Sequence, residues 1–394
     1  MVSGIGNVIF NFLSTLHQQG SIKNICRFIF FRLRKSKVIT VRRRGNKKWA
    51  YIAYIPEALV REDIAYLNGH QNRREMKMIA ECFLDNGYNI VVHDYQDKSS
   101  APDHTYDVVF GLEPNFTICA RQHPLATKVY YGTGAYSKYA NAAVIGRTDE
   151  FNRKHGVAIQ PRRLAPDDDC AEICDKILQI GSRNTIETYP EHLRQKIMLI
   201  DQSSNFLRSD LSRLDVPMRN KFIWLGSSGS ILKGVDLVIE AFMSHPELEI
   251  DLVGPIEEDV KAVYEHRLAK SPNIRFHGFV DINSDKFLQI IRGTSFLIYP
   301  SVTEGGAPGA VIACMKLGIV PIVSKVASSD NCDNLGFVFE NVSLESVEAA
   351  LTWCKRLQNG EIYRLGSENI KESTKYTIEN FRTQFNNYVR QWNG

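Results

Sequence analysis

The sequence lacks three features that would place the protein in a special class. It has no stretch of 18 or more apolar residues, so it predicts no membrane-spanning helix. None of its eight cysteines forms a C-x-x-C pair, and several lie in apolar runs, which favours a reducing, cytoplasmic compartment. The net charge of +4 is small for 394 residues and predicts no nucleic-acid partner. The length and the 44% hydrophobic content are instead typical of a globular protein of two domains.

Acidic residues are absent from residues 1–48, which carry eleven lysines and arginines. Within this segment Ile22, Ile25, Ile29 and Leu33 fall at helical spacing. A basic amphipathic helix of this kind binds anionic membrane surfaces. Residues 20–48 therefore predict that the protein binds peripherally to the inner face of the plasma membrane. The alternative is a helix packed on the domain, followed by a solvated basic linker. The first residues lack a positive start and a small-residue cleavage site, so we expect no signal peptide.

From Trp49 onward, short apolar runs of strand length alternate with segments of helical periodicity. The runs form two sets: 49–55, 89–93, 106–110, 128–131, 177–181 and 197–201, then 222–226, 249–254, 273–278, 296–300 and 320–324. This pattern predicts two doubly wound α/β domains of the Rossmann-like kind, over residues 49–218 and 219–373. The closing segment, 374–394, is apolar at helical spacing and needs a groove to pack in.

Two loops of the second domain follow predicted strands, where parallel sheets bind their ligands. The first contains Gly226, Ser227, Ser228 and Gly229 and leads to Lys233, which suits a pyrophosphate because small residues expose backbone N–H groups beside a cation. A tight turn with a solvated lysine is the alternative reading. The loop lacks the spacing of a Walker A motif.

The second loop places Glu304 before five small or rigid residues at a helix start. These five are Gly305, Gly306, Ala307, Pro308 and Gly309. A carboxylate there orients sugar hydroxyls while unpaired N–H groups hold phosphate oxygens. The plainer reading is that Glu304 caps the helix.

Three segments, 225–242, 273–280 and 299–324, resemble the C-terminal half of the group 1 glycosyltransferases, the large retaining family of GT-B fold. The resemblance covers about residues 221–330 well and the N-terminal half weakly. It implies two Rossmann-like domains facing a central cleft, a nucleotide diphosphate sugar held mainly by the C-terminal domain, and no cofactor or metal. It also implies that Lys233 contacts the diphosphate, that Glu304 contacts the sugar, and that Phe279 and Val280 mark the base-binding loop. The closing helix within residues 374–394 is expected, on the same resemblance, to return and complete the N-terminal domain.

Two departures from the family pattern stand out. The family's second glutamate, aimed at the ribose, is replaced by Ile312 at the usual offset, or by Ala313 if one inserted residue is allowed. The arginine that many members carry after the first glycine is Ser227 here. A degenerate, non-catalytic member is therefore one alternative.

The N-terminal half should hold the acceptor. His70, Asn72 and Glu75 lie in a polar loop after the first strand and could bind a hydroxyl or move a proton, although a capped helix start explains them equally well. Family members often place a histidine of this domain against the sugar, and His104 and His123 are the guesses.

The sequence therefore predicts an enzyme that transfers a hexosyl-type sugar from a nucleotide diphosphate sugar to a hydroxyl acceptor with retention. The basic start suggests a lipid-linked acceptor and a role in bacterial surface polysaccharide or glycolipid assembly. The rivals are a non-catalytic nucleotide-sugar-binding partner and a nucleotide-sugar 2-epimerase. The base, the sugar, the acceptor, the linkage and the oligomeric state are left open.

Overall fold

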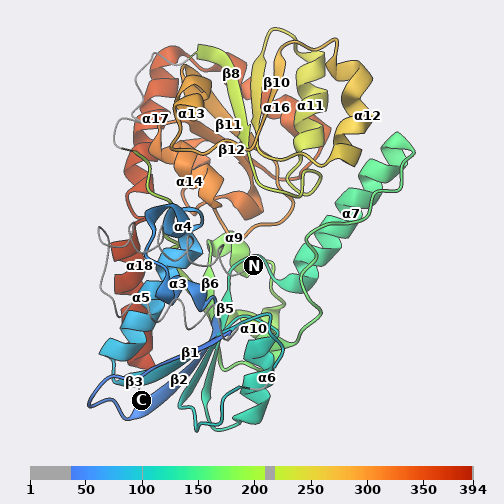
Figure 1. Cartoon of the computed structure of the whole chain (residues 1–394). Helices are drawn as coiled ribbons and strands as arrows, with labels where there is room; N and C mark the ends of the chain where they lie inside the picture. Colours follow the sequence, from blue (N-terminus) through green and yellow to red (C-terminus); the bar gives the residue numbers. More distant parts are fainter. Residues whose placement is uncertain (1–36, 100, 209–217, 393–394) are drawn as a thin grey trace, which may run out of the picture.

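The computed structural model describes residues 37–99, 101–208 and 218–392, which form two α/β domains (Figure 1). Each domain is built on one sheet, of seven and six strands respectively. Among the described residues all paired strands are parallel except β1 (Val38–Val41) and β3 (Tyr88–Asp94), which are antiparallel. The predicted fold class is confirmed.

The N-terminal sheet has the order β1-β3-β2-β4-β5-β6-β7. Its other strands are β2 (Lys48–Tyr54), β4 (Val108–Gly111), β5 (Thr127–Gly132), β6 (Lys176–Ile180) and β7 (Ile197–Ile200). Its helices are α3 (Glu57–Val60), α4 (Ile64–Asn68), α5 (Gln71–Asp85), α6 (Asn115–Gln122), α7 (Ser137–His155), α8 (Cys170–Ile173), α9 (Arg183–Ile186) and α10 (Glu191–Arg194). Buried side chains line both faces of the sheet, which is why its strands read as continuous apolar runs.

The C-terminal sheet has the order β10-β9-β8-β11-β12-β13. Its strands are β8 (Met218–Leu225), β9 (Glu249–Val253), β10 (Ile274–Gly278), β11 (Thr294–Tyr299), β12 (Val320–Ser324) and β13 (Phe337–Phe339). Its helices are α11 (Val235–Ser244), α12 (Glu258–Leu268), α13 (Asp285–Ile291), α14 (Gly309–Lys316), the 3-10 turn η1 (Lys325–Ala327), α15 (Cys332–Leu335), α16 (Leu344–Arg356) and α17 (Asn359–Ser373). One large apolar core fills this domain.

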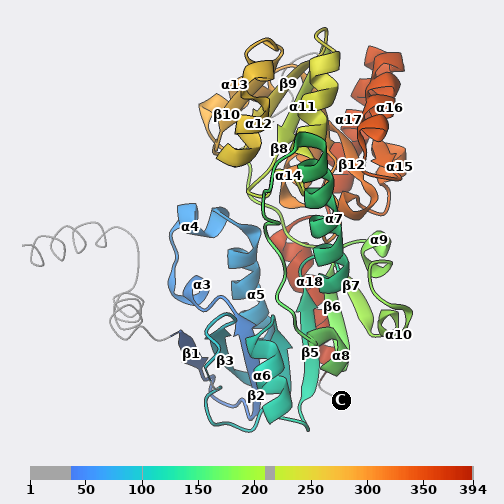
Figure 2. The same ribbon diagram turned by 90° about the vertical axis from the view of Figure 1, so that its right-hand side faces the viewer.

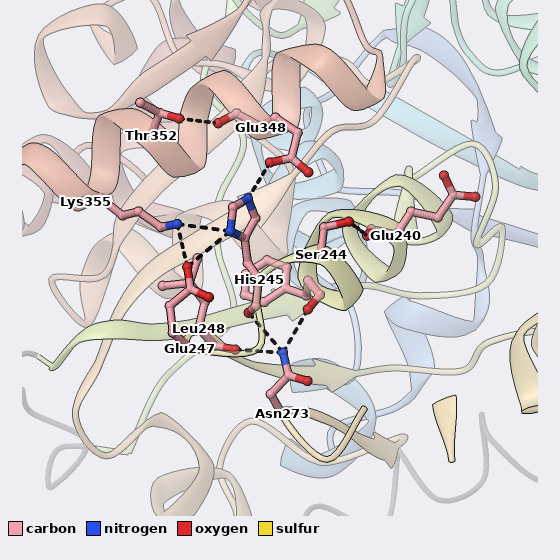
Figure 3. Close-up of polar contacts among 10 residues, drawn as sticks. Glu240, Ser244, His245, Glu247, Leu248, Asn273, Glu348, Thr352 and Lys355 are labelled. Atoms are coloured by element: carbon pink, nitrogen blue, oxygen red, sulfur yellow. Dashed lines mark hydrogen bonds and ion pairs between the residues drawn. The ribbon is translucent and has the colours of Figure 1, made fainter. Parts of the chain in front are cut away.

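A polar cluster around His245 ties two helices of this domain together (Figure 3). His245 ends α11. Its Nε2 lies 2.6 Å from a carboxylate oxygen of Glu348, and its Nδ1 lies 3.0 Å from the ammonium of Lys355, both on α16. Glu247 completes the cluster with a bond to Lys355 of 2.6 Å. The cluster is distant from the loops that were predicted to bind a ligand, and we assign it a structural role.

The last helix, α18 (Ile378–Gln391), packs against α5 of the N-terminal domain. Its buried face consists of Phe381, Phe385 and Val389, and Trp392 follows at its end; all four join the core beneath β2, β3 and β4. The chain therefore crosses to the C-terminal domain and returns, so the two domains are connected twice.

A long helix, α7, reaches from the N-terminal domain along the C-terminal one (Figure 2). Arg147 of α7 forms a buried ion pair with Asp236 of α11, and Lys154 pairs with Glu240. These contacts join α7 to the helix that follows the first predicted binding loop. The orientation of the domains is thus fixed by side chains as well as by the two chain crossings.

The predicted membrane helix lies outside the described residues, apart from the basic stretch 37–48. That stretch belongs to the first domain, because β1 pairs with β3 and Arg43 contacts Asp85 at 2.5 Å. The predicted boundary at residue 48 therefore falls inside the sheet. None of the helices in the described parts of the chain is long and apolar enough to cross a membrane.

Candidate active site

A cleft of about 560 Å³ lies between the two domains, at the carboxyl ends of their strands. Its volume is in the range of small-molecule sites. Twelve of the predicted site residues line it: Gly226, Ser227, Lys233, Phe279, Val280, Glu304, Gly305, Pro308, Gly309, His70, Asn72 and Glu75. The other four, Ser228, Gly229, Gly306 and Ala307, do not line the cleft. The two loops of the C-terminal domain and the polar loop of the N-terminal domain therefore face one space.

Lys233 and Glu304 are joined through a tyrosine. The Lys233 Nζ donates to the Tyr299 hydroxyl at 2.8 Å, and that hydroxyl donates to Glu304 Oε1 at 2.7 Å. The direct distance from Nζ to Oε1 is 3.6 Å. Ser301 adds a second hydroxyl on the same oxygen, at 3.2 Å. Oε1 is thus held by the protein, whereas Oε2 forms no hydrogen bond with the described residues and is available to a ligand.

Burial lowers the pKa of Lys233, and the Glu304 carboxylate opposes that change. The lysine side chain is 6% exposed, at the bottom of the cleft. The Lys233 ammonium has three N–H donors, and its one hydrogen bond to the described residues goes to the Tyr299 hydroxyl. A phosphate group arriving in the cleft would complete its pairing.

The first loop is only partly available to a ligand. The N–H groups of Gly229 and Ser230 donate to the carboxylate of Glu257, at 2.6 and 2.9 Å. Gly229 was expected to bind the donor, and instead its N–H and that of Ser230 fix the loop to the start of α12. A diphosphate in the cleft is left with Ser227, which is exposed and lines the cleft, and with the Lys233 ammonium.

The glycine pair of the second loop serves the domain interface. A Cβ on Gly305 would meet the Gly134 Cα at 2.9 Å, and one on Gly306 would meet the Gly181 Cα at 2.8 Å. Gly306 also has a φ of +73° and gives its N–H to the Val326 carbonyl. The small residues thus let the N-terminal domain approach, while the first turn of α14, from Gly309, opens to the cleft.

The structure decides between the two positions for the missing second glutamate. Ala313 lines the cleft, whereas Ile312 is fully buried in the core of the C-terminal domain. Ala313 is therefore the residue that faces the ligand space, and it offers no polar contact.

On the N-terminal side, His70 and Glu75 flank the start of α5. The His70 Nδ1 accepts the N–H of Asn72 at 3.3 Å, which caps the helix and leaves Nε2 for a ligand. Glu75 is buried, and its Oε1 accepts the N–H and the hydroxyl of Ser203 at 2.6 and 2.9 Å. Burial raises the pKa of Glu75 to about 7. Its Oε2 and the Asn72 Oδ1 have no hydrogen-bond partner among the described residues.

The guess that His104 or His123 faces the sugar is wrong. His104 stacks on Trp49 with ring centroids 4.3 Å apart, and His123 packs edge-on against Tyr106. Neither lines the cleft, where His70 stands instead. The helical periodicity of residues 76–84 could have favoured His70, because the helix that leads from one parallel strand to the next begins on the side of the sheet where the first strand ends.

Sequence reasoning missed several cleft residues. Tyr54, Tyr95, Gln202 and Tyr299 line the space, and so does Arg163 from the segment after α7. Tyr299 lies near the end of the predicted strand 296–300, five residues before Glu304, so its position at the sheet edge could have been predicted from the sequence. Nothing in the local sequence distinguishes Arg163.

The fold and the site define a two-domain protein of GT-B architecture with its ligand space between the domains. Residues 219–355 match the family model described as glycosyl transferases group 1, which confirms the resemblance read from the sequence. A search of curated protein sequences finds no significant match.

Solved structures of similar fold cover most of the chain. A sucrose-phosphate synthase from Thermosynechococcus elongatus aligns with a TM-score of 0.57 and 12% identity, covering 88% of this chain and 99% of the other. HepE from Anabaena, in complex with UDP-glucose, aligns with 0.54 and 12% identity over 87% and 99%. WaaG, a glycosyltransferase involved in lipopolysaccharide biosynthesis, aligns with 0.51 and 13% identity over 86% and 99%. At these identities the likeness is one of fold.

Proposed function

We propose that the protein is a glycosyltransferase that uses a nucleotide diphosphate sugar as donor. The observation that carries this proposal is the chain of contacts from Lys233 through Tyr299 to Glu304 at the bottom of the interdomain cleft. It sets a cation for the diphosphate beside a carboxylate for sugar hydroxyls. Phe279, with 83% of its surface exposed at the cleft wall, offers a face on which a base can stack.

The chemistry is electrostatic. As the bond between the anomeric carbon and the phosphate oxygen breaks, negative charge grows on the diphosphate and positive charge on the sugar ring. Lys233 stabilises the first, and Glu304 holds the sugar in place through its free oxygen. Because the protein supplies the charge, we expect transfer to need no metal, and EDTA should leave turnover unchanged.

Retention of the anomeric configuration is part of the proposal. The departing phosphate can itself take the proton of the acceptor hydroxyl, so that the acceptor attacks on the face that the phosphate leaves. The acceptor would then sit beside His70 and Glu75, which line the same cleft.

We further propose a hydroxyl acceptor that is lipid-linked and presented at the inner membrane surface. The support is the run of lysines and arginines without acidic residues over residues 1–48. Of the proteins that share the fold, HepE was solved in complex with UDP-glucose, and WaaG is a glycosyltransferase involved in lipopolysaccharide biosynthesis. A place in surface polysaccharide or glycolipid assembly fits this combination.

The test is a screen of UDP- and GDP-sugars for hydrolysis or transfer, first without acceptor and then with membrane lipid extracts. We expect one donor to be consumed faster when an acceptor is present. Conversion of donor into an isomeric nucleotide sugar without acceptor would establish an epimerase. Binding without turnover under all conditions would establish a non-catalytic partner, the function that the apolar Ala313 in place of an acid favours.

A further inference from the structure

The loop that carries Lys233 meets a second cation, which comes from the other domain. The segment between α7 and α8 runs back from the C-terminal domain, where α7 ends, to the N-terminal domain, where α8 packs. Along this segment the guanidinium of Arg162 binds Asp259 at the start of α12 in two bonds of 3.0 and 2.5 Å. The next residue, Arg163, donates from Nη1 to the Ser228 carbonyl at 3.2 Å. Arg163 lines the interdomain cleft, whereas Arg162 does not.

The backbone of Arg163 adopts an unfavourable conformation, and this conformation places its side chain at the cleft. Its φ is +63°, a left-handed conformation that a residue with a side chain adopts at a cost. Neighbouring bonds hold the segment in place, since the Asn141 side chain binds the N–H and the carbonyl of Ala165 at 2.8 and 3.0 Å. The glycine at position 229 makes room, because a Cβ there would lie 3.1 Å from the Arg163 Cδ.

The charge of Arg163 is not neutralised within the described part of the chain. No carboxylate of those residues forms an ion pair with it, whereas Arg162 beside it has a bidentate partner. Arg163 and Lys233 line the same cleft, and the charge of Arg163 adds to the burial that lowers the pKa of Lys233. Two cations that face one space attract a dianion more strongly than either alone.

We propose that Arg163 binds the donor diphosphate together with Lys233, so that the donor is held by both domains at once. The proposal rests on the proposed function, because it takes the diphosphate as the ligand. A guanidinium offers a planar fork that matches two phosphate oxygens, and that geometry suits it for such a site. Arg163 compensates for the serine at position 227, which leaves the loop itself with a single cation.

The test compares wild type with Arg163→Gln in calorimetric titrations with UDP, GDP and their nucleosides. Arg163→Gln should weaken binding of the preferred diphosphate at least tenfold and leave the matching nucleoside within twofold. Arg163→Lys should bind the diphosphate with an affinity between those of wild type and Arg163→Gln. Arg121→Gln is the matched control, because it removes an exposed arginine, paired with Asp169, from the same domain.

The outcomes separate the two proposals. If wild type binds neither diphosphate, the proposed function fails, and this inference fails with it. If wild type binds one and Arg163→Gln binds it equally well, only the role of Arg163 is refuted. Equal losses for diphosphate and nucleoside would mean that the arginine merely supports the loop through Ser228, which also contradicts the proposal. A weaker salt dependence of diphosphate binding in Arg163→Gln would support it.

Discussion

The two domains have the same architecture, yet the ligand-binding residues of the C-terminal domain are easier to recognise in the sequence than those of the N-terminal domain. In the C-terminal domain, the important side chains follow strand ends in short loops, and Lys233 and Glu304 meet because β8 and β11 are neighbours in the sheet. In the N-terminal domain, the cleft is assembled from distant segments, such as His70, Arg163 and Gln202. Loops that bind a diphosphate need the same kinds of residue, small ones and cations, whereas the residues that bind an acceptor depend on which acceptor it is.

The strongest test of this contrast is removal of the donor-side charges. Lys233→Met and Glu304→Gln should each lower kcat by about 100-fold or more, because each removes a group that faces charge in the transition state. Steady-state kinetics with saturating acceptor would measure this.

Arg364→Gln serves as control for that experiment, since Arg364 pairs only with Glu368 on the exposed face of α17 among the described residues. It should retain wild-type turnover. Comparable losses in the control, or full activity in either donor-side variant, would mean that the cleft is not where transfer occurs.

A smaller effect is expected on the acceptor side. Glu75→Gln keeps the oxygen that Ser203 binds but cannot ionise, so it should raise the KM for the acceptor about tenfold while leaving donor binding unchanged. If donor affinity falls instead, the division of labour between the domains is wrong.

The same variant makes a prediction about pH. The pKa of Glu75 is raised from 4.5 to about 7, so the folded state retains a proton that the unfolded chain loses between these values. Wild-type stability therefore falls as the pH rises through this window, by roughly 3 kcal/mol from this group. Glu75→Gln should gain stability relative to wild type between pH 5 and pH 8 in urea unfolding. A constant difference would show that the carboxyl is already ionised at pH 5.

The smallest effect should come from the cluster remote from the cleft. His245→Ala removes the link between α11 and α16 and should lower the free energy of unfolding by about 1 kcal/mol, as partly exposed polar pairs do. Nucleotide binding should be unchanged. A loss of binding would reveal that α11 transmits strain from this cluster to the loop at Gly226.

Most of the fold could be predicted from the sequence, because strands that are buried on both faces appear as apolar runs. Two strands at sheet edges were not predicted. β1 is an apolar strand of only four residues set between basic residues, and β13 is three residues long, so neither stood out as a strand in the sequence. The return of α18 to the N-terminal core followed from the resemblance rather than from periodicity, which indicated only that the helix needed a groove.

The site could be predicted from the sequence where residues close together in one loop bind the same part of the ligand. Lys233 and Glu304 could be named, but the use of the Gly229 N–H by Glu257, and of Gly305 by the domain interface, depends on contacts between segments far apart in the sequence. For the same reason Arg163 could not be found, since only the course of its segment along the other domain brings it to the loop.

The central claim is that a nucleotide diphosphate sugar binds between the two domains, on the loops of the C-terminal one. Hydrogen exchange measured with and without the donor that the screen identifies tests it most directly. The account predicts slower exchange in peptides covering residues 226–234 and 301–313, with a lesser effect over 156–169. Protection confined to the N-terminal sheet, or absent from both C-terminal loops, would contradict it.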